Sequence, residues 1–280
     1  MYAFSFIGQK DFEKCKLDSK NTIKIKNPLG EEYSLMRTSM MPTVMQSIAT
    51  NYNKKNKDVA LFEIGKTYVD EKNNIKQNEL PLETEQIAFA IYGKNADFYI
   101  VKGIIENILQ VSNIARYQIE RENALNLHPG KSAKILIGKD SIASFGEVHP
   151  EVLENYGINE KVYYAVLDLE KFAKYGKSNK KYTPIPKYPA VERDIAIVVD
   201  EDIEVGQIES IISKKAKNIL ERAKLFDIYR SDKLGENKKS VAYELIFRAQ
   251  DRTLTDDEIK NTMEVITKEL QITLGAELRT

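Results

Sequence analysis

The stretch "KSVAYELIFRAQDRTLTDDEI", residues 239–259, joins a strand pattern directly to the start of a helix. Its first half alternates apolar with smaller or polar residues, which is the period of a strand with one buried face. The apolar positions are Val241, Tyr243, Leu245 and Phe247. Thr255 followed by three acids is typical of a helix start, because a hydroxyl caps free backbone amides and carboxylates favour that end of the helix dipole. Gly275 is a conventional stop, so the sequence predicts one long helix between them.

The segments around this stretch complete a recognisable order of elements. "RDIAIVVD" (193–200) and "ERAKLFDIYRS" (221–231) are typical of strands, and "EVGQIESIISKKAKNIL" (204–220) of a helix between them. "AELR" (276–279) would be a short last strand. The order βαββαβ predicts a ferredoxin-like split sandwich, in which two helices cover one face of the sheet and leave the other open.

Alternation assigns side chains to the two faces of this sheet. Phe226 and Ile228 should point into the core, while Asp227 and Tyr229 point the other way. The same rule places further residues on the open face: Ala196, Ser240, Ala242 and Arg248. For an arbitrary strand, a solvated face is the ordinary explanation of such residues.

Residues 1–175 predict a different, mixed α+β region. Strands are indicated at 21–28 and 59–69 and repeatedly between 132 and 169, and a broad apolar stripe predicts a helix at 97–111. The segment 38–55 is a Met-rich helix, with Pro42 tolerated in its first turn. Its apolar positions at helical spacing are Met41, Val44, Met45, Ile48 and Tyr52. This stripe is either ordinary core or a surface for a partner, where adaptable Met is also common. Residues 176–188, rich in Lys and Pro, are expected to be a linker.

Composition excludes several classes of function. Lys plus Arg and Asp plus Glu both number 42, so no overall field attracts polyanions or anionic membranes. No apolar run approaches the ~20 residues of a membrane helix. A single cysteine, Cys15, excludes an internal disulfide and fits a reducing cytoplasm. Neither phosphate-binding glycine pattern occurs, and no base accompanies Cys15. His128 and His149 each precede a proline without further ligands nearby, so structural roles are expected for both.

Taken together, successive blocks of the chain resemble the β subunit of bacterial phenylalanyl-tRNA synthetase. The blocks "NPLGEEYSLMRTSMMPTVMQSIATNYNKK", "VALFEIGKTYV", "DFYIVKGIIENIL", "HPGKSAKI" and "FGEVHPEVLENYGI" resemble its catalytic-like domain. "KYPAVERDIAIVVDEDI", "KLFDIYRS", the 239–259 stretch and "LGAELR" resemble its ferredoxin-fold anticodon-binding domain. Their order and spacing, rather than any one block, carry the resemblance.

The resemblance implies a fold and a function for each region. Residues 1–175 would be a class II synthetase-like antiparallel sheet domain without reactive residues, docking on the α subunit through the Met-rich helix. Residues 189–280 would bind the anticodon of tRNA(Phe). The family's enzyme is an α2β2 phenylalanine–tRNA ligase that uses ATP and Mg²⁺, with catalysis in α. The chain itself would then be inactive and cytoplasmic, and would bind no cofactor, metal, DNA or membrane. Since the usual β subunit is much longer, we expect this chain to be either a C-terminal fragment of one or a natural truncation.

The resemblance also implies residue roles on the open face. The family places matching Asp, Tyr and Ser residues against the guanine that begins phenylalanine anticodons. Tyr229 would stack on that base while Asp227 and Ser240 read its edge, with Ala196 and Arg248 on the same face. Two alternatives stay open: a free-standing enzyme, and a protein-interaction module on a ferredoxin-like scaffold without RNA binding. Residues 181–280 carry 17 basic and 19 acidic side chains, a net charge of −2, which predicts weak RNA binding by the isolated chain. Arg252 would serve either the neighbouring acids or a phosphate.

Overall fold

The computed structural model describes residues 1–71, 80–176 and 184–279. By their contacts the residues form two compact units, Met1–Lys180 (unit 1) and Lys181–Thr280 (unit 2). Most of the expected linker at 176–188 lies outside the described residues. Both units combine helices with antiparallel sheets, so the predicted α+β class is confirmed.

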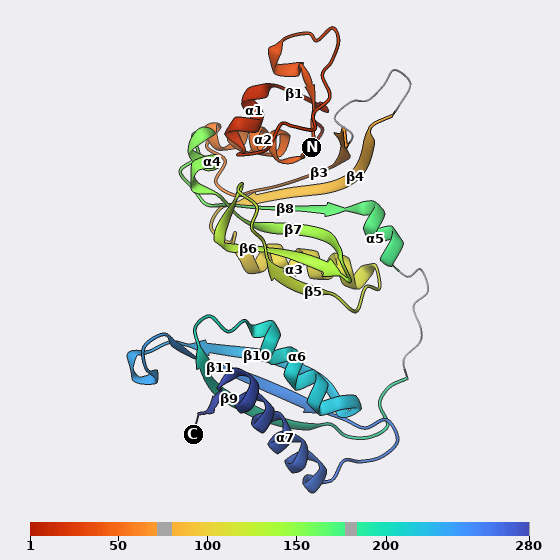
Figure 1. Ribbon diagram of the computed structural model, residues 1–280, viewed down its shortest axis with the longest axis vertical. Coiled ribbons are helices and arrows are strands. Elements are labelled where there is room, and N and C mark those ends of the chain that lie inside the picture. The colour runs from red at the N-terminus through yellow and green to blue at the C-terminus, as the bar shows by residue number, and fades with distance from the viewer. Residues whose placement is uncertain (72–79, 177–183, 280) are drawn as a thin grey trace. The chain divides into compact units, whose positions relative to one another are not determined.

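Unit 1 is built on a six-stranded antiparallel sheet with the order β3-β4-β8-β7-β6-β5 (Figure 1). Its strands are β3 (Val59–Val69), β4 (Leu82–Tyr92), β5 (Gln118–Arg121), β6 (Leu127–Ile137), β7 (Asp140–Val148) and β8 (Val162–Asp168). A separate two-stranded sheet pairs β1 (Phe6–Ile7) with β2 (Leu35–Met36). The expected strand at 21–28 is wrong, because only the single bridge between Lys24 and Leu35 forms there.

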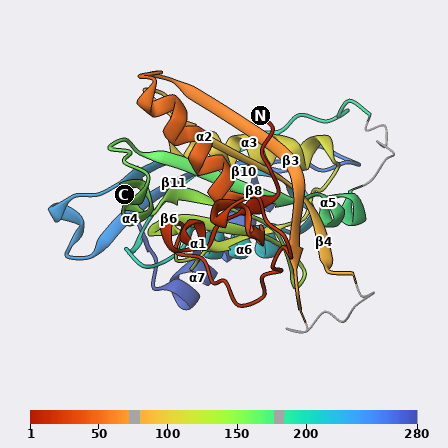
Figure 2. The ribbon, with the colours of Figure 1, turned by 90° about the horizontal axis from the view of Figure 1, so that it is seen from above.

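The helices of unit 1 cover both faces of the large sheet. They are α1 (Gln9–Lys14), α2 (Met41–Asn53), α3 (Phe98–Val111), α4 (Pro150–Asn155) and α5 (Leu169–Tyr175), with a 3-10 turn η1 (Glu31–Tyr33). Successive residues of β4 alternate between two cores: Ala88 and Ala90 pack with α2 and α4, while Phe89 and Ile91 pack with α3 and α5. Figure 2 shows α2 lying beside the border strand β3. A two-sided core of this kind needs apolar residues on both faces of the central strands, as β4 supplies.

Local capping explains where several of these helices begin. Asp97 accepts a hydrogen bond from the Ile100 amide at 2.7 Å, and Asp168 accepts one from the Lys171 amide. The His149 side chain accepts from the Glu151 amide and so caps α4, just before Pro150. These are the bonds that satisfy otherwise free amides in a first turn.

A buried ion pair ties the segment before α2 to β3. The guanidinium of Arg37 lies 3.0 Å from the Glu63 carboxylate, and both side chains are almost fully buried. Arg37 also donates to the Lys66 carbonyl and to the Thr43 hydroxyl. Because removing one partner would leave a buried charge uncompensated, such a change is expected to cost about 3–5 kcal/mol. Nothing in the sequence pattern had singled out this pair.

Unit 2 is a four-stranded antiparallel sheet with the order β10-β11-β9-β12 and two helices on one face (Figure 1). Its elements are β9 (Val191–Asp200), α6 (Val205–Ala216), η2 (Lys217–Ile219), β10 (Leu220–Tyr229), η3 (Asp232–Leu234), β11 (Lys238–Phe247), α7 (Asp256–Leu274) and β12 (Glu277–Leu278). The order βαββαβ is the predicted ferredoxin-like sandwich. Thr255 and Glu258 form a reciprocal capping box at the start of α7, and Gly275 ends it with a φ of 61°.

A β-bulge in β10 changes one predicted side-chain direction. Leu225 pairs with Tyr243 and Asp227 with Ala242, so Phe226 is an extra residue in the strand. Leu225 and Ile228 therefore both pack on the helix-covered core, and Phe226 is 54% exposed. The expectation that Phe226 is buried is wrong, because simple alternation cannot anticipate an inserted residue.

Candidate nucleic-acid interface

The open face of the unit 2 sheet gathers most of the predicted binding residues. Ala196, Ala242 and Asp227 lie opposite one another on the three neighbouring strands β9, β11 and β10. Tyr229 and Ser240 are the next facing pair along β10 and β11. We call these five residues the open-face cluster. Their side chains share one face because each strand alternates and the bulge leaves Asp227 and Tyr229 in phase with β11.

Size and exposure differ sharply within the open-face cluster. Tyr229 is 43% exposed and Asp227 is exposed, whereas Ser240 is 2% and Ala242 9% exposed. The small side chains of Ser240 and Ala242 therefore lie close to the sheet, and the phenol of Tyr229 and the carboxylate of Asp227 project from the neighbouring strand β10. A flat π-face next to a carboxylate is an arrangement that can stack on a base and accept hydrogen bonds from its edge.

Arg279, which the sequence reasoning did not single out, also belongs to this surface. It follows β12, and its backbone amide donates to the Ala196 carbonyl at 2.9 Å. Its guanidinium carbon lies 5.0 Å from the centre of the Tyr229 ring, and its Nη1 lies 3.3 Å from the Ser240 Oγ. The predicted last strand "AELR" placed this residue at the sheet, but its pairing with β9 is a long-range contact that pattern alone does not specify.

Arg248 does not join the open-face cluster. It follows the far end of β11, and at ~3.3 Å per residue it lies about 26 Å along the strand from Ser240. Its guanidinium pairs with Glu221 and donates to the Tyr188 carbonyl. Its predicted place in the binding site is corrected accordingly: it ties together the opposite end of the sheet.

The Met-rich stripe of α2 is core rather than surface. Met41, Val44, Met45 and Ile48 each have 0% exposure and pack inside unit 1, and Tyr52 is half-buried against the same core. A side chain without exposed surface cannot touch a partner, so the expected docking role of these four residues is corrected. The alternative interpretation of the stripe, ordinary core, is the one the structure supports.

The remaining reactive candidates have local roles. Burial raises the pKa of the Cys15 thiol to about 12, and its sulfur contacts the Tyr156 hydroxyl, so a nucleophilic thiolate is not available at neutral pH. The His128 ring accepts from the Gly130 amide, as a structural residue does. Arg252 pairs with Asp251 and Glu258 at the start of α7, which agrees with a role for the neighbouring acids.

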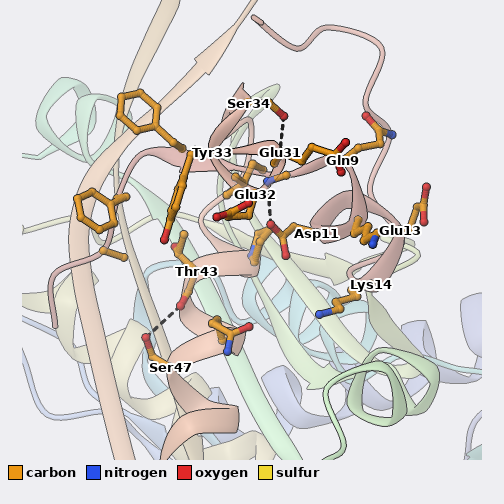
Figure 3. A pocket seen from close by; sticks show the side chains of 18 residues that line it. Gln9, Asp11, Glu13, Lys14, Glu31, Glu32, Tyr33, Ser34, Thr43 and Ser47 are labelled. Carbon is orange, nitrogen blue, oxygen red and sulfur yellow. Dashed lines mark hydrogen bonds between the residues drawn. The ribbon is translucent and has the colours of Figure 1, made fainter. Parts of the chain in front are cut away.

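Unit 1 contains a pocket of about 1020 Å³ between α1, η1 and the start of α2 (Figure 3). Several of its polar groups are engaged in local hydrogen bonds. Asp11 accepts from the Gly8 amide, Ser47 donates to the Thr43 carbonyl, and Ser34 donates to the Glu31 carbonyl. The geometry joins no nucleophile to a base in this pocket.

Within the described ranges, no group of three or more His, Cys, Asp or Glu side chains is arranged to hold a metal ion. Over the same residues, no helix combines the length and apolarity that crossing a membrane requires.

Comparisons with known proteins also divide the chain into two parts. Residues 1–169 match the family model "Phenylalanyl tRNA synthetase beta chain CLM domain", and residues 186–279 match "Ferredoxin-fold anticodon binding domain". The phenylalanine–tRNA ligase beta subunits of Clostridium tetani and Clostridium acetobutylicum are 43% and 40% identical to the chain over 99% of its length. That of Fusobacterium nucleatum is 37% identical over 92%. The chain spans about a third of the length of these relatives: 35%, 35% and 33%.

A solved structure shares the fold at low identity. The pyrrolysyl-tRNA synthetase of Desulfitobacterium hafniense matches with a TM-score of 0.50 and 13% identity, covering 62% of this chain and 61% of that one. This likeness bears on the fold alone. The family models account for nearly all of the sequence, and the open-face cluster lies within the part that matches an anticodon-binding domain. The chain belongs to the phenylalanyl-tRNA synthetase beta chain family.

Proposed function

We propose that unit 2 binds the anticodon of tRNA(Phe) through the open-face cluster. The observation that carries this proposal is the exposed Tyr229 ring beside the Asp227 carboxylate, on the open face of a domain that matches an anticodon-binding family. In this role the chain would be the RNA-reading end of a phenylalanine–tRNA ligase. Such a ligase would work in the cytoplasm, where tRNA is charged.

The chemistry of the cluster suits an unpaired guanine. The phenol of Tyr229 offers a stacking surface, and stacking on an aromatic side chain contributes about 1–3 kcal/mol per base. The Asp227 carboxylate accepts from the N1 and N2 donors of guanine, whereas adenine presents an acceptor at N1. Ser240, close to the sheet, would complete the edge contact. Unit 2 has a net charge of −2, so its RNA binding would depend on base stacking and hydrogen bonds more than on non-specific electrostatic attraction to phosphates.

Two variants test this proposal in the reconstituted synthetase. Tyr229→Ala should lower the affinity for tRNA(Phe) about ten-fold or more, because the stacking surface is lost. Asp227→Asn should reduce the preference for guanine over adenine at the first anticodon position more than it reduces total binding. Asp257→Asn, the same change on the helix-covered side, is the matched control. If both open-face variants bind like the unsubstituted protein, the face is only solvated, and a protein-interaction role becomes the better explanation.

A second proposal concerns unit 1, which we propose docks on the α subunit of the synthetase. The supporting observation is an apolar surface on the border strand β3, where Phe62 and Ile64 are 58% and 54% exposed. These side chains alternate with the buried Glu63, so they share one face of the strand. Border strands with exposed apolar residues are prone to association, and soluble proteins normally cover them.

We further propose that the ligation chemistry resides in the α subunit, with ATP and Mg²⁺ bound by the whole synthetase. The support lies in unit 1 itself. Burial raises the pKa of its one thiol, Cys15, and the side chains of the charged pair Arg37–Glu63 are almost fully buried. The chain would then contribute assembly and recognition rather than a reacting group.

A further inference from the structure

Arg279 covers two members of the open-face cluster at once. Its backbone is fixed to β9 through the Ala196 carbonyl, and its side chain crosses the sheet toward β11 and β10. There the guanidinium lies over the Tyr229 ring, 5.0 Å from its centre, and donates to the Ser240 hydroxyl at 3.3 Å. One arginine therefore occupies the aromatic surface and the hydroxyl that a bound base would use.

The electrostatic surroundings of Arg279 differ from those of its neighbours. Four other arginines of unit 2 each pair with a carboxylate. They are Arg193, Arg230, Arg248 and Arg252. Arg279 is exposed at the surface, and its side chain contacts the Tyr229 ring and the Ser240 hydroxyl, with no ion pair to a carboxylate among the residues that the structure describes. Among the described residues, its positive charge is therefore not paired with a carboxylate, in a unit whose net charge is −2.

We propose that Arg279 is a phosphate-binding residue of the anticodon site, displaced from the Tyr229 ring when a base stacks there. This inference rests on the proposed anticodon binding. Stacked atoms approach to about 3.5–4 Å, so no base fits between the ring and a guanidinium carbon at 5.0 Å. The side chain must move when that ring surface is used, while its backbone stays anchored beside Ala196.

The displaced guanidinium has a natural new partner. A base on Tyr229 would bring its own flanking phosphates within reach of a long side chain whose backbone is anchored at Ala196, opposite the neighbouring Ala242–Asp227 pair. A guanidinium fork matches phosphate oxygens with two parallel hydrogen bonds, which a lysine ammonium cannot reproduce. Arg279 would thus exchange an aromatic ring and a hydroxyl for a phosphate, and supply a positive charge beside the open-face cluster in a unit whose net charge is −2.

The salt dependence of RNA binding tests this role. We would measure the affinity of the reconstituted synthetase for tRNA(Phe) and for an anticodon stem-loop RNA between low and moderate salt. Arg279→Ala should weaken binding several-fold with either guanine or adenine at the first anticodon position. It should also reduce the slope of log affinity against log salt by about 0.7–1, the value for one lost phosphate contact. Arg279→Lys should keep the slope while recovering only part of the affinity.

Arg252→Ala is the matched control, since it removes the same charge from a guanidinium already paired with Asp251 and Glu258. Its salt slope should stay unchanged. An unchanged salt slope for Arg279→Ala would overturn the inference. Tighter RNA binding by that variant would also overturn it, because Arg279 would then only block the Tyr229 ring. Melting temperature checks that β12 remains in place. If Tyr229→Ala still weakens binding while Arg279→Ala does not, only this inference fails; if neither has an effect, the proposed function fails with it.

Discussion

The apolar stripe of α2 and the open-face cluster of unit 2 began as equivalent predictions, each a set of residues sharing one face. In the structure, Met45 and Ile48 on α2 have no exposed surface, whereas Tyr229 on β10 is 43% exposed. In both elements the periodicity therefore identified which residues share a face, but not whether other parts of the chain cover that face. Exposure depends on elements far away in the chain, here α4 and the β4–β8 pair, which pack on α2. A binding surface can be read from a sequence only where nothing else in the chain is available to cover it.

The largest expected effect contrasts the buried stripe with the exposed border of the same unit. Met45→Asp should destabilise the chain by about 3–5 kcal/mol or more, because it buries an unpaired charge in a packed core. The double variant Phe62→Ser/Ile64→Ser should melt within a few degrees of the unsubstituted chain, yet lose co-purification with the α subunit. Thermal unfolding and the mass of the complex measure the two effects.

If the Met45→Asp variant remains folded but no longer co-purifies with the α subunit, α2 is a docking surface after all. Co-purification that survives the β3 substitutions would instead assign Phe62 and Ile64 to a second copy of the chain or to another part of a longer β subunit. The mass of the unsubstituted chain alone distinguishes those two occupants.

A second prediction compares a buried and an exposed side chain within three residues of β10. Ile228 packs on the helix-covered core and Phe226, beside the bulge, is exposed. Ile228→Ala should cost about 1–3 kcal/mol of unfolding free energy, while Phe226→Ala should stay within about 0.5 kcal/mol although it removes more atoms. Denaturant unfolding measures both. A larger loss for Phe226→Ala than for Ile228→Ala would mean that β10 has no bulge and that plain alternation was right.

The smallest expected effect is electrostatic and lies at the exposed start of α7. A hydrogen bond from the Thr255 backbone, together with Arg252, lowers the pKa of Glu258. A lowered folded-state pKa stabilises the chain above the unfolded value of about 4.3, and this contribution is lost as the pH falls through the folded value. Glu258→Gln should therefore be less stable than the unsubstituted chain at pH 7, with a difference that shrinks below about pH 4.5. Glu264→Gln, farther along α7, is the control, and a pH-independent difference would assign Glu258 a purely geometric role.

Local sequence signals predicted most of the elements. The strand at 59–69 and the helix at 97–111 were found almost to the residue, because their periods are long and uninterrupted. The strand expected at 21–28 does not form, because among the described residues this segment makes only one β-bridge, between Lys24 and Leu35, and has no neighbouring strand along its length. Alternation needs a neighbouring strand before it becomes a sheet, and the sequence of one segment does not say whether a neighbour exists.

The binding face was predicted in part for the same reason. Asp227, Tyr229 and Ser240 come together because strand pairing keeps them on one face in two neighbouring facing pairs, and alternation could anticipate that shared face. Arg279 was missed because its place depends on β12 pairing with β9, a contact between residues far apart in sequence. The buried Arg37–Glu63 pair was missed for a related reason, since charged residues are expected at the surface unless a partner is known.

The bulge at Phe226 has a consequence for insertions and deletions. Losing one residue from a strand normally turns every following side chain to the opposite face. In β10, a chain without Phe226 would read Leu225, Asp227, Ile228, Tyr229, which is a regular alternation of inward and outward positions. The strand therefore already contains a spare residue, and relatives with a strand one residue shorter at this point could keep the same core and the same open face.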